Sequence, residues 1–168
     1  MTSWLLHTAL MCGFIVLQSV VFPAGLIRGA VPDLALILLC FSAHHHGSYR
    51  GELSGFAGGI VLDALSLAPL GFHALIRTFI GFLYGLFRGK IFIDPIFVPV
   101  VMVVVATIIK AILGYLLSAI FAPEIASTVF SERFGIELGL NAVIAPFFFA
   151  LLKALGMVRQ GRDQLSYE

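Results

Sequence analysis

The feature that most limits the possible folds is a series of apolar segments, several of them long enough to cross a membrane as helices. A chain inside the hydrocarbon core must satisfy its backbone hydrogen bonds internally, and an α-helix of about 20 residues does so across the whole core. The 168-residue chain is 60% hydrophobic and 11% charged, which lies outside the range of soluble domains. The sequence therefore predicts an all-α integral membrane protein with a single transmembrane domain, residues 1–168.

The apolar segments predict a bundle of six transmembrane helices. The apolar stretch 52–87 is too long for one helix, and the sequence "APLG" at its centre favours a turn that divides it in two. The segment 34–43 is fully apolar but short, so a complete crossing there requires residues on both flanks. The predicted spans are 4–22, 31–49, 52–69, 71–88, 96–121 and 136–158.

The basic residues predict the orientation of this bundle. Six spans place both termini on the same side of the membrane, and Lys and Arg are enriched in cytoplasmic segments. Basic residues on the side of the termini are Arg50, Arg88, Lys90, Arg159 and Arg162, whereas Arg28 and Arg133 fall on the other side. We therefore expect both termini to be cytoplasmic.

Two stripes of small residues flank the predicted turn. Residues spaced four apart share one face of a helix, and small residues on that face let two helix backbones approach closely. The stripe before the turn is Gly51, Gly55, Gly59 and Asp63, and the stripe after it is His73, Arg77, Gly81, Gly85 and Gly89. The spacing predicts a tight antiparallel hairpin of the spans 52–69 and 71–88.

Asp63 is the unexpected member of the first stripe. A charge near the bilayer centre costs about 2.5 to 3.5 kcal/mol on insertion scales, so it usually faces the bundle interior and finds a partner. Arg77 is the nearest cation across the turn. We predict an Asp63–Arg77 ion pair that fixes the hairpin, and we favour this structural role over a transport or catalytic site.

Further polar residues are predicted in the outer half of the bundle. Asp33 follows Pro32 at the start of a span, where a carboxylate caps free N–H groups, so we favour a capping role over a ligand-binding one. The residues expected to converge there are Asp33, Asp63, His73, Glu137 and Asn141. Lys110 lies near the middle of the span 96–121 and needs a carboxylate or carbonyl partner, and both a structural and a functional role remain open.

The sequence gives little support for enzymatic chemistry. The histidines 44–46 are adjacent, and helical neighbours point about 100° apart, so they cannot share one metal ion. Cys12 and Cys40 lie in apolar runs and are expected to pack as small hydrophobic residues. No nucleophile or carboxylate pair has a working spacing. We expect no enzyme activity, no cofactor and no metal, and the net charge of +1 gives no basis for nucleic-acid binding.

Three motifs together resemble the MreD family of bacterial rod shape-determining proteins. They are "VPDL", "GFAGGIVLDALSLAPLGFHAL" and "GFLYG", and the resemblance covers about a third of the chain. It implies a non-enzymatic subunit of the cell-elongation complex in the bacterial inner membrane. Its implied partners are an MreC-like bitopic protein and, through it, a RodA-type glycosyltransferase, a class B transpeptidase and the MreB filament.

An alternative follows from a more distant resemblance. The MreD family is similar to the substrate-binding components of energy-coupling-factor transporters, which are six-helix proteins with an external ligand pocket. In such a component Asp33, Asp63, His73, Arg77 and Glu137 would form a pocket for a vitamin-sized molecule. A bound small molecule and coupling ATPases would indicate the transporter component, whereas recovery of membrane cell-wall proteins would indicate the scaffold.

Overall fold

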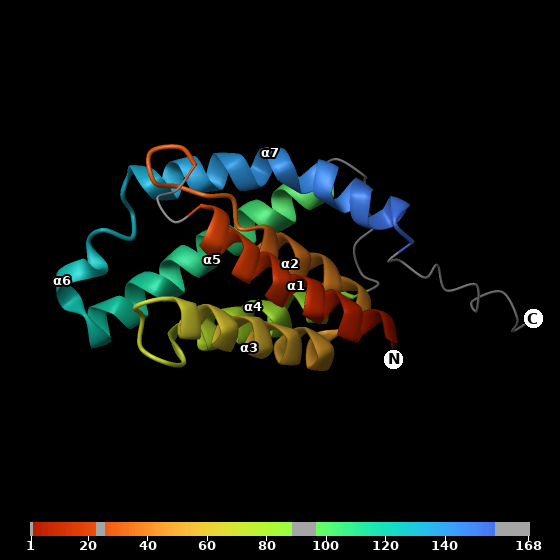
Figure 1. Ribbon diagram of the computed structural model, residues 1–168, viewed down its shortest axis with the longest axis horizontal. Helices are drawn as coiled ribbons and strands as arrows, with labels where there is room; N and C mark the ends of the chain where they lie inside the picture. The colour runs from red at the N-terminus through yellow and green to blue at the C-terminus, as the bar shows by residue number, and fades with distance from the viewer. Residues whose placement is uncertain (1, 23–25, 89–96, 157–168) are drawn as a thin grey trace, which may run out of the picture.

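The computed structural model describes residues 2–22, 26–88 and 97–156, and the regular structure within these residues is helical apart from one isolated bridge between Ile27 and Ala30. The helices are α1 (Thr2–Val21), α2 (Leu34–His46), α3 (Ser48–Leu65), α4 (Phe72–Leu86), α5 (Phe97–Phe121), α6 (Pro123–Ala126) and α7 (Glu132–Ala154). The prediction of an all-α protein is confirmed. The longer helices alternate in direction along one axis, so that α1 begins and α7 ends at the same end of the bundle (Figure 1). We call this the N-terminal end and the opposite one the α6 end.

The six longer helices overlap the six predicted spans, with shifted bounds. α1, α5 and α7 are long and apolar enough to cross a membrane, and α2 and α4 are shorter apolar helices. The protein is therefore a multi-pass membrane protein, while full crossing by the helices α2 to α4 stays a prediction. α7 begins at Glu132, four residues before the predicted span. Residues 96 and 157–158 of the predicted spans, and Gly89, Lys90, Arg159 and Arg162, lie outside the described residues.

The short helix α2 occupies the centre of the bundle. It contacts α1, α3, α4, α5 and α7, and its ten residues 35–44 are all buried. A helix that is apolar on nearly every side packs inside a bundle, which explains the short segment 34–43, apolar except for Ser42. The helix is shorter than the predicted span 31–49. The helix ends at His46 because Gly47 adopts φ 89°, a conformation that favours glycine, and α3 begins at the next residue.

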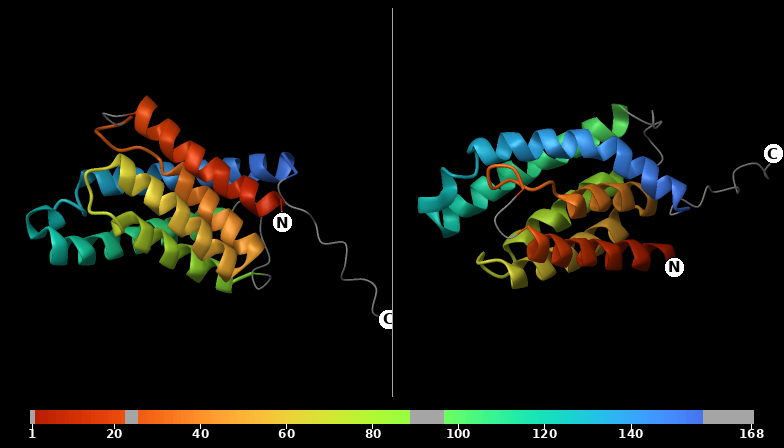
Figure 2. Two further views of the ribbon diagram at one scale, coloured as in Figure 1. Left: turned by 60° about the horizontal axis from the view of Figure 1, so that its bottom comes forward. Right: turned by 45° about the horizontal axis from the view of Figure 1, so that its top comes forward.

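The helices α3 and α4 are packed backbone to backbone and lie side by side in every view (Figure 2). A Cβ atom on Gly55 would lie 2.1 Å from the Arg77 carbonyl oxygen, and one on Gly81 would lie 2.1 Å from the Gly51 carbonyl oxygen. A Cβ atom on Gly59 or on Gly85 would lie about as close to the opposite backbone, at 2.2 and 2.3 Å. These distances leave no room for a side chain, so the hairpin depends on glycine at each position.

Candidate functional site

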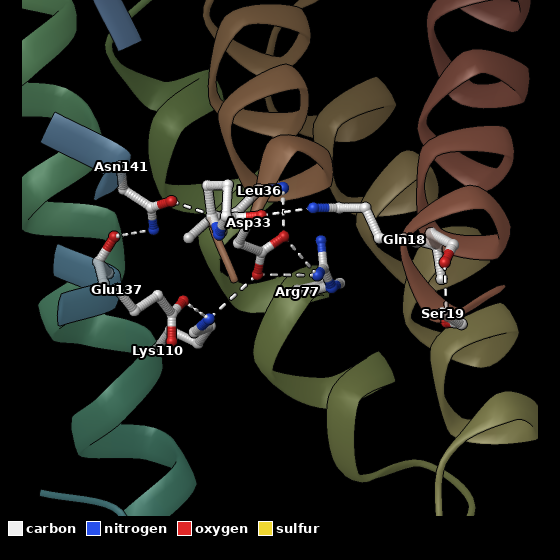
Figure 3. A network of polar contacts seen from close by, with 11 residues as sticks. Gln18, Ser19, Asp33, Leu36, Arg77, Lys110, Glu137 and Asn141 are labelled. Atoms are coloured by element: carbon white, nitrogen blue, oxygen red, sulfur yellow. Dashed lines mark hydrogen bonds and ion pairs between the residues drawn. The ribbon is translucent and has the colours of Figure 1, made fainter. Parts of the chain in front are cut away.

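The site is built around Asp33, which precedes the first turn of α2 (Figure 3). Its Oδ1 accepts a hydrogen bond of 2.9 Å from the Leu36 backbone N–H, so Asp33 caps the helix. Both carboxylate oxygens also accept hydrogen bonds from Nη2 of Arg77, at 2.9 and 3.0 Å. The Arg77 residue is only 3% exposed. This buried ion pair joins α4 to the start of the central helix α2.

Lys110 extends the same group of charges toward α5 and α7. Its Nζ donates to Asp33 Oδ2 at 3.0 Å and also donates to Oε1 of Glu137. These two carboxylates are the partners that the sequence did not identify. We call Asp33, Arg77, Lys110 and Glu137 the charge cluster. Its two cations and two carboxylates balance, and it connects four helices, α2, α4, α5 and α7.

Neutral hydrogen bonds continue outward from the charge cluster. The Asn141 side chain accepts from the Asp33 backbone N–H at 2.8 Å and donates to Thr107 Oγ1 at 3.0 Å. On the other side, Gln18 of α1 donates to the Pro32 carbonyl oxygen. Sequence reasoning missed Thr107 and Gln18. The available signal was that each is an isolated polar residue inside a long apolar span, where such groups usually face the bundle interior.

Asp63 lies at the α6 end, where the chain turns from α3 into α4. Its carboxylate accepts from the backbone N–H groups of Gly71, His73 and Ala74, at 2.9, 2.8 and 3.2 Å, and it also lies 2.8 Å from His73 Nδ1. The N-cap residue of α4 is Gly71, which has no side chain to cap the helix. Asp63 therefore caps α4 from across the turn, where the free N–H groups and the helix dipole both favour a negative charge.

The predicted ion pair between Asp63 and Arg77 is wrong. Asp63 lies closest to the N–H groups that open α4, whereas Arg77 lies about one and a half turns farther along that helix. The guanidinium of Arg77 is directed to Asp33. The physical reason is that free backbone donors satisfy Asp63 locally, which leaves the arginine to neutralise the carboxylate on α2.

A cavity of about 660 Å³ lies at the α6 end beside the charge cluster. Segments from α4, α5 and α7 line it together with the turn after α3 and the segment between α6 and α7. The charged or titratable residues on its wall are Asp33, His73, Arg77, Lys110, Arg133 and Glu137. A second cavity of about 250 Å³ includes Gln18 and is also lined by all four members of the charge cluster. The cluster therefore contributes to the walls of both cavities.

The candidate residues from the sequence thus form three groups. Asp33, Arg77, Lys110, Glu137 and Asn141 make one connected network, with Asp33 at its centre. Asp63 and His73 make a separate pair at the α3–α4 turn, and His73 also lines the large cavity. The third group is the five glycines on the faces where α3 and α4 contact each other: 51, 55 and 59 of α3, and 81 and 85 of α4. Over the described residues, no group of three or more His, Cys, Asp or Glu side chains is placed to hold a metal ion.

Fold and site define a multi-pass membrane protein whose central helix is held to its neighbours by buried and partly buried ion pairs. A family model described as rod shape-determining protein MreD matches residues 1–155, and the chain belongs to this family. Membership implies a rod shape-determining membrane protein. No match was found among curated proteins or among solved structures.

Proposed function

We propose that this protein is a non-enzymatic scaffold subunit of the bacterial cell-elongation complex, with both termini in the cytoplasm. In this role it binds an MreC-like bitopic protein and, through it, a RodA-type glycosyltransferase, a class B transpeptidase and MreB. The observation that carries the proposal is the family match over residues 1–155, which covers every described helix.

The charge cluster supports a structural role for the buried charges. Each of its cations contacts a carboxylate, and the cluster joins α2 to three other helices. Removing one member of a buried ion pair leaves an uncompensated charge, which typically costs about 3 to 5 kcal/mol. Together with the glycine contacts between α3 and α4, the cluster favours one fixed arrangement of helices, as a scaffold requires.

The outer faces of the long helices offer surfaces for a partner's transmembrane helix. Within lipid, helices associate through close packing and hydrogen bonds, because lipid tails are as apolar as the helix surface. Large exposed apolar side chains on these faces include Leu17 and Val20 on α1, Val105 and Ile112 on α5, and Val143 and Phe147 on α7. Contact by the partner can therefore be mapped one helix face at a time.

Cross-linking in native membranes tests the proposal. A tagged copy of the full chain is cross-linked, purified under denaturing conditions and examined by mass spectrometry, with an unrelated tagged multi-pass protein at equal abundance as the control. We expect specific recovery of an MreC-like protein. Tryptophan variants of Leu17, Ile112 and Phe147, one on each exposed face, should then reveal the contact face as the one whose variant loses the partner.

One observation favours the second candidate, a substrate-binding component of an energy-coupling-factor transporter. The 660 Å³ cavity lies within the range of about 300 to 1,000 Å³ that is typical of small-molecule sites. The family match favours the scaffold as the function of the whole chain. Recovery of transporter ATPases in place of an MreC-like protein would reverse that order.

A further inference from the structure

We propose that the large cavity at the α6 end is a binding site for an amphiphile with an apolar body and an anionic head group. Three features of the cavity support this assignment: the glycine that keeps it open, the charge on its wall and its apolar sides. The inference stands apart from the scaffold function, because it concerns what fills the interior of the bundle and not what contacts its outer faces.

Gly114 lines the cavity at a position where helix packing does not require a glycine. It is a buried residue of α5 and lines the cavity, yet a Cβ atom built on it meets a single neighbour, Ile76 Cδ1, at 4.0 Å. Glycine inside a helix costs about 1 kcal/mol relative to alanine. The glycines of the α3–α4 hairpin offset this cost by backbone contact, but no neighbour excludes a side chain at position 114. Its effect is to leave space inside the cavity.

The charge on the cavity wall favours an anionic head group. Arg77, Lys110 and Arg133 line the cavity, against the carboxylates of Asp33 and Glu137, so one positive charge is in excess. Arg133 forms no ion pair within the described part of the chain. An anionic group can therefore bind the Arg133 guanidinium without disturbing the existing ion pairs.

The rest of the cavity wall favours an apolar body. Phe72 and Ile76 of α4, Phe121 of α5 and Phe134 of α7 line it. A ligand pocket with largely apolar walls and a few polar groups orients a molecule by its polar end. Its place at one end of a membrane bundle admits two sources for such a molecule: an anionic lipid of the bilayer, or a water-soluble carboxylate with an apolar chain.

Photo-cross-linking of the full chain in zwitterionic nanodiscs tests the proposal and separates the two sources. One arm uses phosphatidylglycerol with a diazirine in its acyl chain, incorporated into the nanodisc. The other uses diazirine-bearing decanoic acid added from water, with the matching decanol as a neutral comparison. We expect at least one anionic probe to label residues of the cavity wall, and the neutral alcohol to label them about tenfold less, because it cannot form a charge-assisted hydrogen bond.

Two variants make the test specific. Gly114→Leu fills the cavity and changes no member of the charge cluster, and it should abolish labelling of the wall. Gly13→Leu, at a position with nothing within 4 Å of an added Cβ, is the matched control and should label like the unmodified chain. Arg133→Gln changes an exposed residue at the cavity and should reduce labelling by the anionic probe only. The proposal is overturned if neither anionic probe labels the wall, if the alcohol labels as well as the acid, or if Gly114→Leu leaves labelling unchanged.

Discussion

The substitution Asp33→Asn tests how much the charge cluster stabilises the bundle. Asparagine caps helices about as well as aspartate, so the hydrogen bond to the Leu36 N–H can persist. What is lost is the negative charge that faces Arg77 and Lys110 at 2.9 to 3.0 Å. The cluster changes from neutral to a net charge of +1, and only Glu137 remains to balance two cations.

The size of the effect follows from the burial of these groups. The side chains of Arg77 and Asp33 are 4% and 12% exposed, so solvent screens this interaction little. Breaking a buried pair by removing one partner typically costs about 3 to 5 kcal/mol, and we expect the free energy of unfolding to fall by that amount. Adding Arg77→Met removes the cation that Asp33 neutralised and leaves the Lys110–Glu137 pair intact, so the double variant should be more stable than Asp33→Asn alone by about 0.5 to 3 kcal/mol.

Unfolding by SDS in mixed micelles measures this free energy. The single tryptophan of the chain reports on folding, because the Trp4 indole donates to Ser54 Oγ at 2.8 Å and to the Arg50 carbonyl at 3.1 Å. The control is Glu132→Gln, which removes an exposed ion pair with Arg28 and should cost about 0 to 1 kcal/mol. Equal stability of Asp33→Asn and Glu132→Gln would refute the reasoning.

Three further predictions use the same protein. Gly55→Ala forces the α3 and α4 backbones apart and should lower the free energy of unfolding by about 1 to 3 kcal/mol or more in the same assay. Gly13→Ala adds a Cβ atom that meets no atom within 4 Å, so it should not destabilise the protein. The Asp63→Asn variant should insert normally, but its free energy of unfolding should fall by about 1 to 3 kcal/mol, because the substitution removes the charge that accepts three backbone hydrogen bonds. Less of the partner should also be recovered with this variant after cross-linking. Unchanged stability and unchanged recovery would contradict this prediction. A cysteine at the fully exposed Leu67 should react with an impermeant maleimide in intact spheroplasts, whereas one at Tyr49 should react only after permeabilisation; the reverse pattern would place the termini outside.

The helical architecture was accessible from the sequence because its signals are local. Apolar length identifies the long helices, and glycine at every fourth position identifies the face on which α3 and α4 meet. The end of α2 was less accessible. A single glycine between two polar segments can lie inside a continuous helix, so Gly47 did not indicate a helix end. Its φ of 89°, which separates α2 from α3, is set by how the two helices pack.

The pairing of charges was not accessible, since it depends on contacts between distant segments. Asp33 lies 44 residues from Arg77 and 77 residues from Lys110. The short separation in sequence suggested Asp63 as the ion-pair partner of Arg77, but that prediction gave no weight to the unsatisfied N–H groups at the start of α4. Counting those donors would have assigned Asp63 to the helix start and left Arg77 to seek another carboxylate.

The glycine stripes and the charge cluster act on the same element. Gly55 packs against the backbone carbonyl of Arg77, so the close packing of α3 and α4 fixes the position of the Arg77 backbone, from which the side chain extends. Asp63 fixes the first turn of α4 from the same side. The guanidinium then reaches Asp33 at the start of the central helix. Close packing in the hairpin therefore determines the position of a charge that anchors α2, and through Lys110 and Glu137 it also fixes α5 and α7, whose outer faces are the surfaces we propose for partners.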